Sequence, residues 1–306
     1  MRRMRAMLTR PAVAPDGAHE AEEGMKWQPY PSGPGHTVVG KVLLAKGVRS
    51  PQLGNRRDLL VYLPPSYDTG ERRYPVLYMH DGQNLFDNHT SYVGEWHVDA
   101  ALEALAPEGL EAIVVGIPNA GTERLHEYSP FPDPQHGGGK GEAYLAFIVE
   151  TIKPQIDRDF RTLPTREHTY VMGSSLGGLI SLYALFRYPE VFGAAGVVSP
   201  AFWFGNHGIF GYVEGFAEVP GRVYMDVGFK EVTLSEVSSR RYLADVRRMH
   251  RLLQRKGLRP GPDYRYVEDP QGKHNESDWA RRLPEALRFL LGAPTPQPRP
   301  ARAGTR

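Results

Sequence analysis

The chain has 306 residues, of which 41% are hydrophobic, and a formal charge of +2 at neutral pH. This length and composition are sufficient for one large core and exclude a disordered chain. The small net charge gives no electrostatic reason to expect a nucleic-acid partner. Because the sequence contains no cysteine, disulfides, thiolate catalysis and thiolate zinc sites are excluded.

The two ends of the chain differ in composition from its middle. Residues 1–25 mix charged residues with proline and show no period, and residues 293–306 are rich in proline. We therefore expect a flexible extension and a disordered tail around one domain at residues 26–292. No stretch reaches the roughly 18 apolar residues of a membrane span, and no apolar signal-peptide segment follows the basic start. A cytoplasmic protein without a membrane partner is expected.

The spacing of apolar residues predicts three strands in succession, followed by alternating strands and helices. The first strands are expected near residues 37–44, 57–63 and 74–80. Later strands are expected at 112–117, 168–172, 193–198, 222–227 and 264–267, and helices at 97–105, 142–160, 179–186, 238–256 and 279–291. This alternation is typical of an α/β fold with a mostly parallel, doubly wound sheet covered by helices on both faces.

The turn Gly173-Ser174-Ser175-Leu176-Gly177 matches the pattern G-x-S-x-G between a predicted strand and a predicted helix. A serine at such a sharp turn is strained, and the flanking glycines let the strand and the helix approach closely. Ser175 is therefore the predicted nucleophile, and the N–H of Leu176 is predicted to face an oxyanion. This arrangement is that of an α/β-hydrolase. The alternative is an ordinary turn rich in glycine and serine.

A general base for this serine is expected after it in the chain, because the order in an α/β-hydrolase is serine, acid, histidine. His274 lies in a polar turn after the last predicted strand, where a base at the carboxyl edge of the sheet is expected. His207 lies in an aromatic loop and His250 in a charged helix. His274 is therefore the predicted base.

The acid that would orient His274 is sought between the serine and this histidine. Glu231 lies in the loop beyond the strand at 222–227, whereas Asp226 lies within that strand. We favour Glu231 and keep Asp226 as the alternative. Asp269 is a weaker third candidate because it is so close to His274 in the sequence.

A second oxyanion donor is expected in the loop after the third strand. The turn His80-Asp81-Gly82-Gln83-Asn84 follows that strand directly, so we predict a backbone N–H near Gln83. Asp81 is a candidate substrate contact, with turn formation as its alternative. The lipase-like run at residues 136–139 (HGGG) comes one strand too late and is interpreted as part of a flexible loop that could serve as a lid.

A group of histidines and aspartates at residues 80–99 could suggest a metal site. Its members lack the helical i, i+4 spacing of ligand pairs, so turn and surface chemistry is favoured over metal binding. The nucleotide-binding patterns G-x-x-x-x-G-K-[ST] and G-x-G-x-x-G and the zinc pattern H-E-x-x-H are not present in the expected positions. We expect no metal and no cofactor.

Several runs of the sequence together resemble the putative-esterase family of α/β-hydrolases, and its bacterial enterochelin-esterase-like branch most closely. They are PVLYMHDGQNLFD (75–87), SPQLGNRRDLLVYLPPSY (50–67), the serine turn with its helix, VVSPAFW (197–203) and GKHNESDW (272–279). The resemblance spans about residues 37–292. It implies Ser175 as nucleophile, Glu231 as acid and His274 as base.

The expected function is that of a serine carboxylic ester hydrolase that acts through an acyl-enzyme on a small acyl, aromatic or siderophore-type ester. The alternatives are an acyltransferase with the same triad and a non-catalytic binding protein on a hydrolase fold. Tyr128, Phe131, Phe202 and Trp203 are candidates for the pocket wall, with core packing as the equal alternative for each. The expected partner is a small-molecule ester, and a homodimer is left open.

Overall fold

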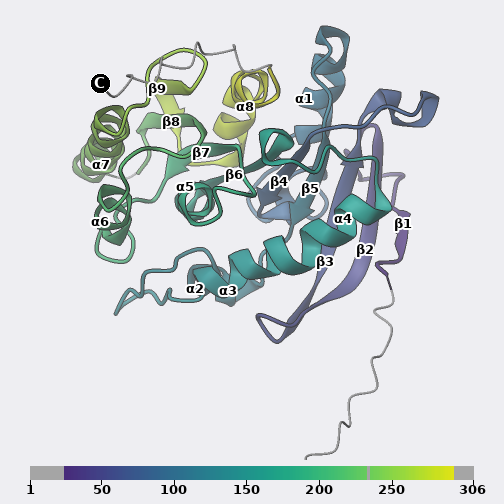
Figure 1. The fold of residues 1–306 in the computed structure, drawn as a ribbon, viewed down its shortest axis with the longest axis horizontal. Helices are drawn as coiled ribbons and strands as arrows, with labels where there is room; N and C mark the ends of the chain where they lie inside the picture. Colours follow the sequence, from purple (N-terminus) through teal and green to yellow (C-terminus); the bar gives the residue numbers. More distant parts are fainter. Residues whose placement is uncertain (1–23, 233–234, 293–306) are drawn as a thin grey trace, which may run out of the picture.

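The computed structural model describes residues 24–232 and 235–292. The extension predicted at residues 1–25 and the tail predicted at 293–306 lie outside the described residues, apart from residues 24 and 25. The domain boundaries therefore stay predictions. Within the described ranges the chain forms one sheet with helices on both of its faces (Figure 1).

The sheet has nine strands in the described ranges, in the order β1-β2-β3-β5-β4-β6-β7-β8-β9. The strands β1 to β3 and the pair β3–β5 are antiparallel, and all pairs from β5 to β9 are parallel. Their bounds are β1 Trp27–Pro29, β2 Lys41–Ser50, β3 Asn55–Leu63, β4 Val76–His80, β5 Ile113–Ile117, β6 Thr169–Ser175, β7 Ala194–Pro200, β8 Arg222–Lys230 and β9 Tyr264–Lys273. The predicted α/β fold with a mostly parallel sheet is confirmed.

The helices cover the sheet in two layers. They are α1 Val98–Leu105, α2 Arg124–Glu127, α3 Gly141–Ala146, α4 Lys153–Asp159, α5 Leu176–Arg187, α6 Gly208–Glu214, α7 Glu236–Arg255 and α8 Glu276–Leu291. One buried apolar cluster contains Leu102 of α1 and Leu283 of α8, whereas the other contains Leu179 of α5 and Val246 of α7. Thus α1 and α8 share one face of the sheet, and α5 and α7 lie on the opposite face (Figure 1).

Several elements differ from the prediction. The strand expected at 37–44 lies at Lys41–Ser50, and the short helices α2 and α6 were not predicted. The strand β1 is only three residues long and is too short to leave an alternating pattern. The helix predicted at 142–160 is interrupted by a π-helical stretch, Phe147–Ile152, between α3 and α4. The last strand continues to Lys273, although it contains Pro270. A proline is tolerated there because β9 is an edge strand of the sheet.

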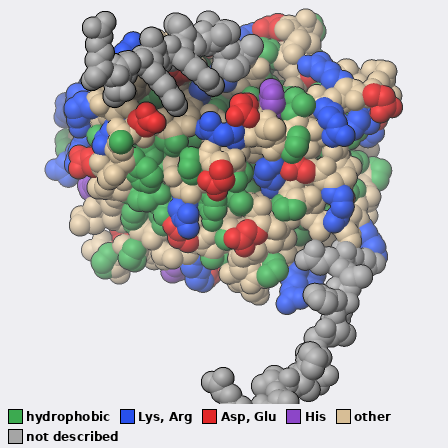
Figure 2. Space-filling model, in the orientation of Figure 1, with side chains coloured by type: hydrophobic (Ala, Val, Ile, Leu, Met, Phe, Trp, Pro, Cys, Tyr) green, Lys and Arg blue, Asp and Glu red, His purple; other side chains and the backbone are tan. Residues whose placement is uncertain are grey.

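The surface carries charges of both signs. Figure 2 shows lysine and arginine side chains interspersed with aspartate and glutamate across the face in view, without a stripe of one sign. Within the part of the chain that the structure describes, no helix combines the length and the apolar character that crossing a membrane requires.

Candidate active site

The turn between β6 and α5 has the strained geometry that the sequence predicts. Ser175 has φ 59° and ψ −122°, a backbone conformation that residues other than glycine rarely adopt. Helix α5 begins at the next residue. A Cβ atom on Gly173 would lie 2.9 Å from Cδ2 of His80 and 3.0 Å from Cα of Gly177. Only glycine fits at this position, because strand β6, helix α5 and strand β4 meet there.

The structure brings His274 and Glu231 into contact. Nδ1 of His274 lies 2.6 Å from Oε2 of Glu231. Glu231 directly follows β8 and His274 directly follows β9, and these strands are parallel neighbours, so their carboxyl ends meet. A carboxylate on Nδ1 holds the imidazole in the tautomer whose Nε2 is free to accept a proton. Glu231 is buried, whereas 26% of the His274 side chain is exposed.

The alternative acid, Asp226, faces a different partner. Its carboxylate is fully buried and contacts the guanidinium of Arg282 at 3.1 and 3.2 Å. Burial raises the pKa of Asp226, and the charge of Arg282 opposes this rise. The third candidate, Asp269, also contacts Arg282, at 3.3 Å. Of the three carboxylates weighed from the sequence, Glu231 is the one that contacts His274.

A cavity of about 630 Å³ opens beside Ser175 and His274. Its other lining residues come from the segment after β7, from the end of β8 and from one side of α7. They are Trp203, His207, Glu231, Val232, Ser238, Arg241, Tyr242, Ala244 and Asp245. Of the aromatic side chains predicted for the pocket, Trp203 lines this cavity and is 40% exposed.

The other three aromatic residues named for the pocket wall do not line this cavity, and their contacts fit the alternative of core packing. Tyr128 and Phe202 have no exposed surface. The Tyr128 hydroxyl accepts a hydrogen bond from the N–H of Asp81 at 2.9 Å, and Phe202 packs edge-on against another buried ring. Phe131 packs against the rings of α5 and α6. Sequence patterns did not separate wall from core, because an aromatic side chain in a loop suits both.

Tyr242 and Trp279 are site residues that sequence reasoning missed. Their rings pack against the imidazole of His274, with ring centres at 5.5 and 5.0 Å. Burial raises the pKa of Tyr242 well above its usual value, and a hydrogen bond with the Ser175 side chain acts in the opposite direction. Tyr242 belongs to the apolar face of α7, so its spacing indicated core packing and carried no sign of contact with Ser175.

The turn after β4 lies against the serine turn. Gly82, Gln83 and Asn84 form a short helical turn after Asp81, whose φ is 56°. A Cβ atom on Gly177 would lie 3.4 Å from Cβ of His80, since β4 and β6 are parallel neighbours. Gln83 and Leu176 therefore both lie at the carboxyl ends of the parallel strands. Its role as an oxyanion donor stays a prediction.

Asp81 has protein partners on both carboxylate oxygens. Arg124 binds them at 2.7 and 2.8 Å, and Asn119 donates to one of them at 2.6 Å. Burial raises the pKa of Asp81, but Arg124, Asn119 and His80 together outweigh burial, so the pKa is lowered. These contacts support turn and ion-pair roles for Asp81. Its contact with substrate stays a prediction.

The HGGG run contacts the wall of the cavity. His136 binds Asp133 at 2.9 Å, and its ring lies 5.9 Å from the ring of Trp203. The carboxylate of Asp133 also accepts from the N–H of Gly205 at 3.3 Å. The loop at 128–141 thus packs beside the segment that carries Trp203. A lid movement of this loop stays a hypothesis.

The histidines and aspartates at residues 80–99 are distributed among separate contacts. Asp87 binds His36 at 2.6 Å, and Asp99 accepts from a backbone N–H at 2.7 Å. His80 is buried beside the serine turn, where its Nδ1 contacts the hydroxyl of Tyr144 at 2.8 Å. Burial lowers the pKa of His80 to about 3. Among the residues that the structure describes, no group of three or more His, Asp or Glu could hold a metal ion.

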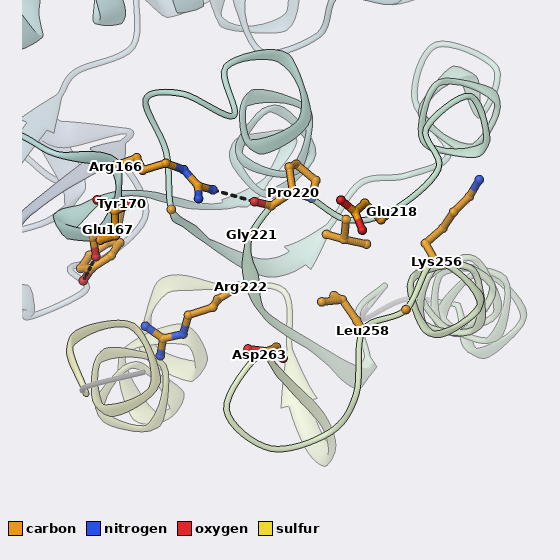
Figure 3. Close-up of a pocket in the computed structure, with 13 residues that line it drawn as sticks. Arg166, Glu167, Tyr170, Glu218, Pro220, Gly221, Arg222, Lys256, Leu258 and Asp263 are labelled. Carbon is orange, nitrogen blue, oxygen red and sulfur yellow. Dashed lines mark hydrogen bonds between the residues drawn. The ribbon is translucent and has the colours of Figure 1, made fainter. Parts of the chain in front are cut away.

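A second cavity of about 340 Å³ lies at the opposite end of the strands, where β6, β7 and β8 begin (Figure 3). Three cations contribute to its lining. Arg166 donates to the carbonyl of Pro220, Arg222 to that of Pro262 and Lys256 to that of Glu214. Neither Ser175 nor His274 lines this cavity. The candidate active site is therefore the cavity of about 630 Å³, which both residues line.

The parallel sheet, the strained serine turn after β6 and the Glu231–His274 contact at neighbouring strand ends define an α/β-hydrolase. A sequence profile of the family described as putative esterase matches residues 50–290. The chain belongs to this family, and the resemblance that the sequence motifs indicated is confirmed. Family membership supports ester hydrolysis as the reaction class.

The chain is similar to two proteins of known sequence and to one solved structure, as follows. The uncharacterised protein YbbA of Bacillus subtilis is 29% identical over 246 residues, which are 78% of this chain and 94% of YbbA. The ferri-bacillibactin esterase BesA of the same organism is 29% identical over 162 residues, or 45% of this chain and 51% of BesA. An IroE-like serine hydrolase from Shewanella oneidensis superposes with a TM-score of 0.65 at 21% identity, covering 81% of this chain and 79% of its own.

Proposed function

We propose that this protein is a serine carboxylic ester hydrolase in which Ser175 is the nucleophile, His274 the general base and Glu231 the acid. The observation that carries the proposal is the 2.6 Å contact between Glu231 and His274, on the wall of the cavity that Ser175 also lines. A buried carboxylate, a partly exposed imidazole and a strained serine are the three groups that acyl transfer requires.

In the proposed reaction, Nε2 of His274 takes the proton of the Ser175 hydroxyl as its oxygen attacks the ester carbonyl. The tetrahedral intermediate collapses when the imidazolium returns this proton to the departing alcohol, which leaves an acyl group on Ser175. A water molecule then gives a proton to His274 and attacks the acyl carbon. The carboxylic acid leaves and Ser175 regains its proton. Glu231 stabilises the imidazolium in both halves.

The proposed oxyanion donors are the backbone N–H groups of Leu176 and Gln83. Leu176 is the first residue of α5, whose positive N-terminal end favours a developing negative charge. Gln83 belongs to the turn after β4, which packs against the serine turn. Donors that are fixed before the reaction stabilise the oxyanion without reorganisation.

The proposed substrate is an ester with a small acyl, aromatic or siderophore-type group. A cavity of about 630 Å³ has room for such a group, and Trp203 offers it an aromatic surface. The relative BesA is named for a siderophore ester, ferri-bacillibactin. A panel of short p-nitrophenyl esters, feruloyl esters and a catecholate trilactone separates these possibilities by their relative kcat/KM.

Labelling with a fluorophosphonate probe tests the proposed nucleophile. The wild type and the matched control Ser174→Ala are expected to be labelled, because Ser175 lines the cavity and Ser174 does not. Ser175→Ala is expected to remain unlabelled. Equal labelling of Ser175→Ala, or no labelling of the wild type, would contradict the proposal. Product analysis with added alcohols identifies the acyl acceptor, and a transfer product in place of the free acid would favour an acyltransferase.

A further inference from the structure

Ser199, at the end of β7, joins the proposed acid to a buried ion pair. Its side chain is fully buried, and its hydroxyl lies 2.7 Å from Oε1 of Glu231. The same hydroxyl oxygen is 2.9 Å from Nη2 of Arg282 and 3.2 Å from Nε1 of Trp279. Ser199 therefore meets three polar groups that come from the loop after β8 and from α8.

The direction of these hydrogen bonds follows from chemistry. A guanidinium and an indole N–H can only donate, so the oxygen of Ser199 accepts from both Arg282 and Trp279. A hydroxyl has one hydrogen, and the carboxylate of Glu231 can only accept it. The hydroxyl of Ser199 must therefore donate to Oε1 of Glu231. The other oxygen, Oε2, is left for His274.

The backbone of Ser199 is also held in place. Its N–H donates to Asp226 at 3.2 Å, and its carbonyl accepts from the hydroxyl of Tyr242 at 2.7 Å. Its φ of 38° is in the left-handed region, which glycine would occupy with less strain. A strained residue that is not glycine suggests that its side chain is needed at this point.

We propose that Ser199 is a positioning residue that fixes the Glu231 carboxylate so that Oε2 faces Nδ1 of His274. This inference rests on the proposed function. Ser199 does not line the cavity, so it acts on the reaction through Glu231 and not through the substrate. Loss of its hydroxyl is therefore expected to lower kcat and leave KM nearly unchanged.

The hydroxyl also affects the contact between Glu231 and His274. Without this donor the carboxylate of Glu231 is less constrained, so its 2.6 Å hydrogen bond with Nδ1 of His274 is expected to weaken. The other groups that face the pair are Tyr242 from α7, the α8 residues Glu276, Trp279 and Arg282, and the N–H of Gly228, which also donates to Oε1 of Glu231, at 2.5 Å. Removal of the Ser199 hydroxyl leaves the Gly228 hydrogen bond, whereas Arg282 and Trp279 lose an acceptor.

The test compares Ser199→Ala and Ser199→Gly with the wild type on a short p-nitrophenyl ester. Rates are normalised to the fraction of protein that fluorophosphonate labels. Hydrogen bonds to charged groups contribute enough that a fall in kcat of about ten- to a hundredfold is expected for both variants. Ser50→Ala is the matched control, because Ser50 is also fully buried and accepts one backbone hydrogen bond, in strand β2. Its normalised kcat is expected to equal that of the wild type.

A second readout does not depend on turnover. The Nδ1 proton of His274, followed by ¹H NMR at neutral pH, is expected at a less downfield chemical shift in both variants than in the wild type, because its hydrogen bond with Glu231 weakens. An unchanged chemical shift, or a normalised kcat of Ser199→Gly equal to that of the wild type, overturns the role of the hydroxyl. The latter result would assign Ser199 a backbone role only. If fluorophosphonate fails to label Ser175 in the wild type, the proposed function fails, while the NMR comparison still decides whether Ser199 controls the Glu231–His274 pair.

Discussion

Two regions of the molecule contain the same kinds of side chain in different settings. At the cavity, Glu231 contacts His274, whose ring is partly exposed. In the interior, Asp226 contacts Arg282, and His80, the last residue of β4, is buried against the serine turn. The interior carboxylate has a permanent cation, and the interior histidine is kept neutral by burial.

The difference shows that residue type and burial do not define a catalytic group by themselves. Glu231 and Asp226 are both buried and lie only a few residues apart. What separates them is the partner: a histidine that reaches the cavity can exchange protons, whereas an arginine cannot. Changes at the cavity are therefore expected to affect rate, and changes in the interior are expected to affect stability.

The largest effect is expected for Glu231→Gln. Without the carboxylate the imidazole loses its tautomer and the imidazolium its stabilisation, so kcat is expected to fall about a thousand- to ten-thousandfold. Steady-state kinetics at neutral pH measure the fall. If Asp226→Asn reduces kcat more than Glu231→Gln does, Asp226 is the acid and the assignment of Glu231 is contradicted.

The next largest effect is expected for Asp226→Asn, and it concerns stability. Neutralising Asp226 leaves Arg282 with only its longer, 3.3 Å contact to the carboxylate of Asp269. Loss of one partner of a buried ion pair costs about 3–5 kcal/mol of the free energy of unfolding. Urea denaturation followed by fluorescence measures this loss. A stability equal to that of the wild type would show that the interior pair does not hold the fold.

His80 makes a smaller, pH-dependent contribution. Because its pKa is about 3 in the folded protein and 6.5 for an unperturbed histidine, the unfolded chain binds a proton that the folded chain does not. Stability from this residue is thus present above pH 6.5 and is lost as the pH falls toward 3, by about 1.4 kcal/mol per pH unit. Urea denaturation is measured at several pH values between 7 and 5. The free energy of unfolding is expected to fall less steeply with decreasing pH for His80→Gln than for the wild type. An equal dependence on pH in the two proteins would contradict a buried neutral histidine.

The smallest effect is expected for Trp203→Ala at the cavity wall. An aromatic contact contributes about 0.5–1.5 kcal/mol, so KM for a feruloyl ester is expected to rise about two- to tenfold. An acetyl ester, which is too small to reach the ring, is the internal control. An equal rise for both esters would mean that Trp203 shapes the site as a whole and does not contact the aromatic group.

Sequence reasoning reached those parts of the site that local order determines. The glycines of the serine turn give a recognisable sequence pattern. His274 and Glu231 directly follow parallel strands, and the carboxyl ends of parallel strands lie on the same side of the sheet. It missed Ser199, because the contacts of this residue come from the loop after β8, from α7 and from α8, and such contacts leave no pattern of spacing in the sequence. It placed Tyr128 and Phe202 at the pocket wall, since aromatic residues in loops carry no mark of which side they face.

The two outer strands of the sheet have a further consequence. One is β1, with three residues, and the other is β9, which contains Pro270 close to its end. Exposed strand edges offer unpaired N–H and C=O groups to any extended chain, and a very short strand or a proline weakens that offer. In the described part of the chain both margins of the sheet are thus guarded against strand addition. The margin that carries Pro270 is also the one that delivers His274, so protection from aggregation and placement of the proposed base are achieved by a single strand.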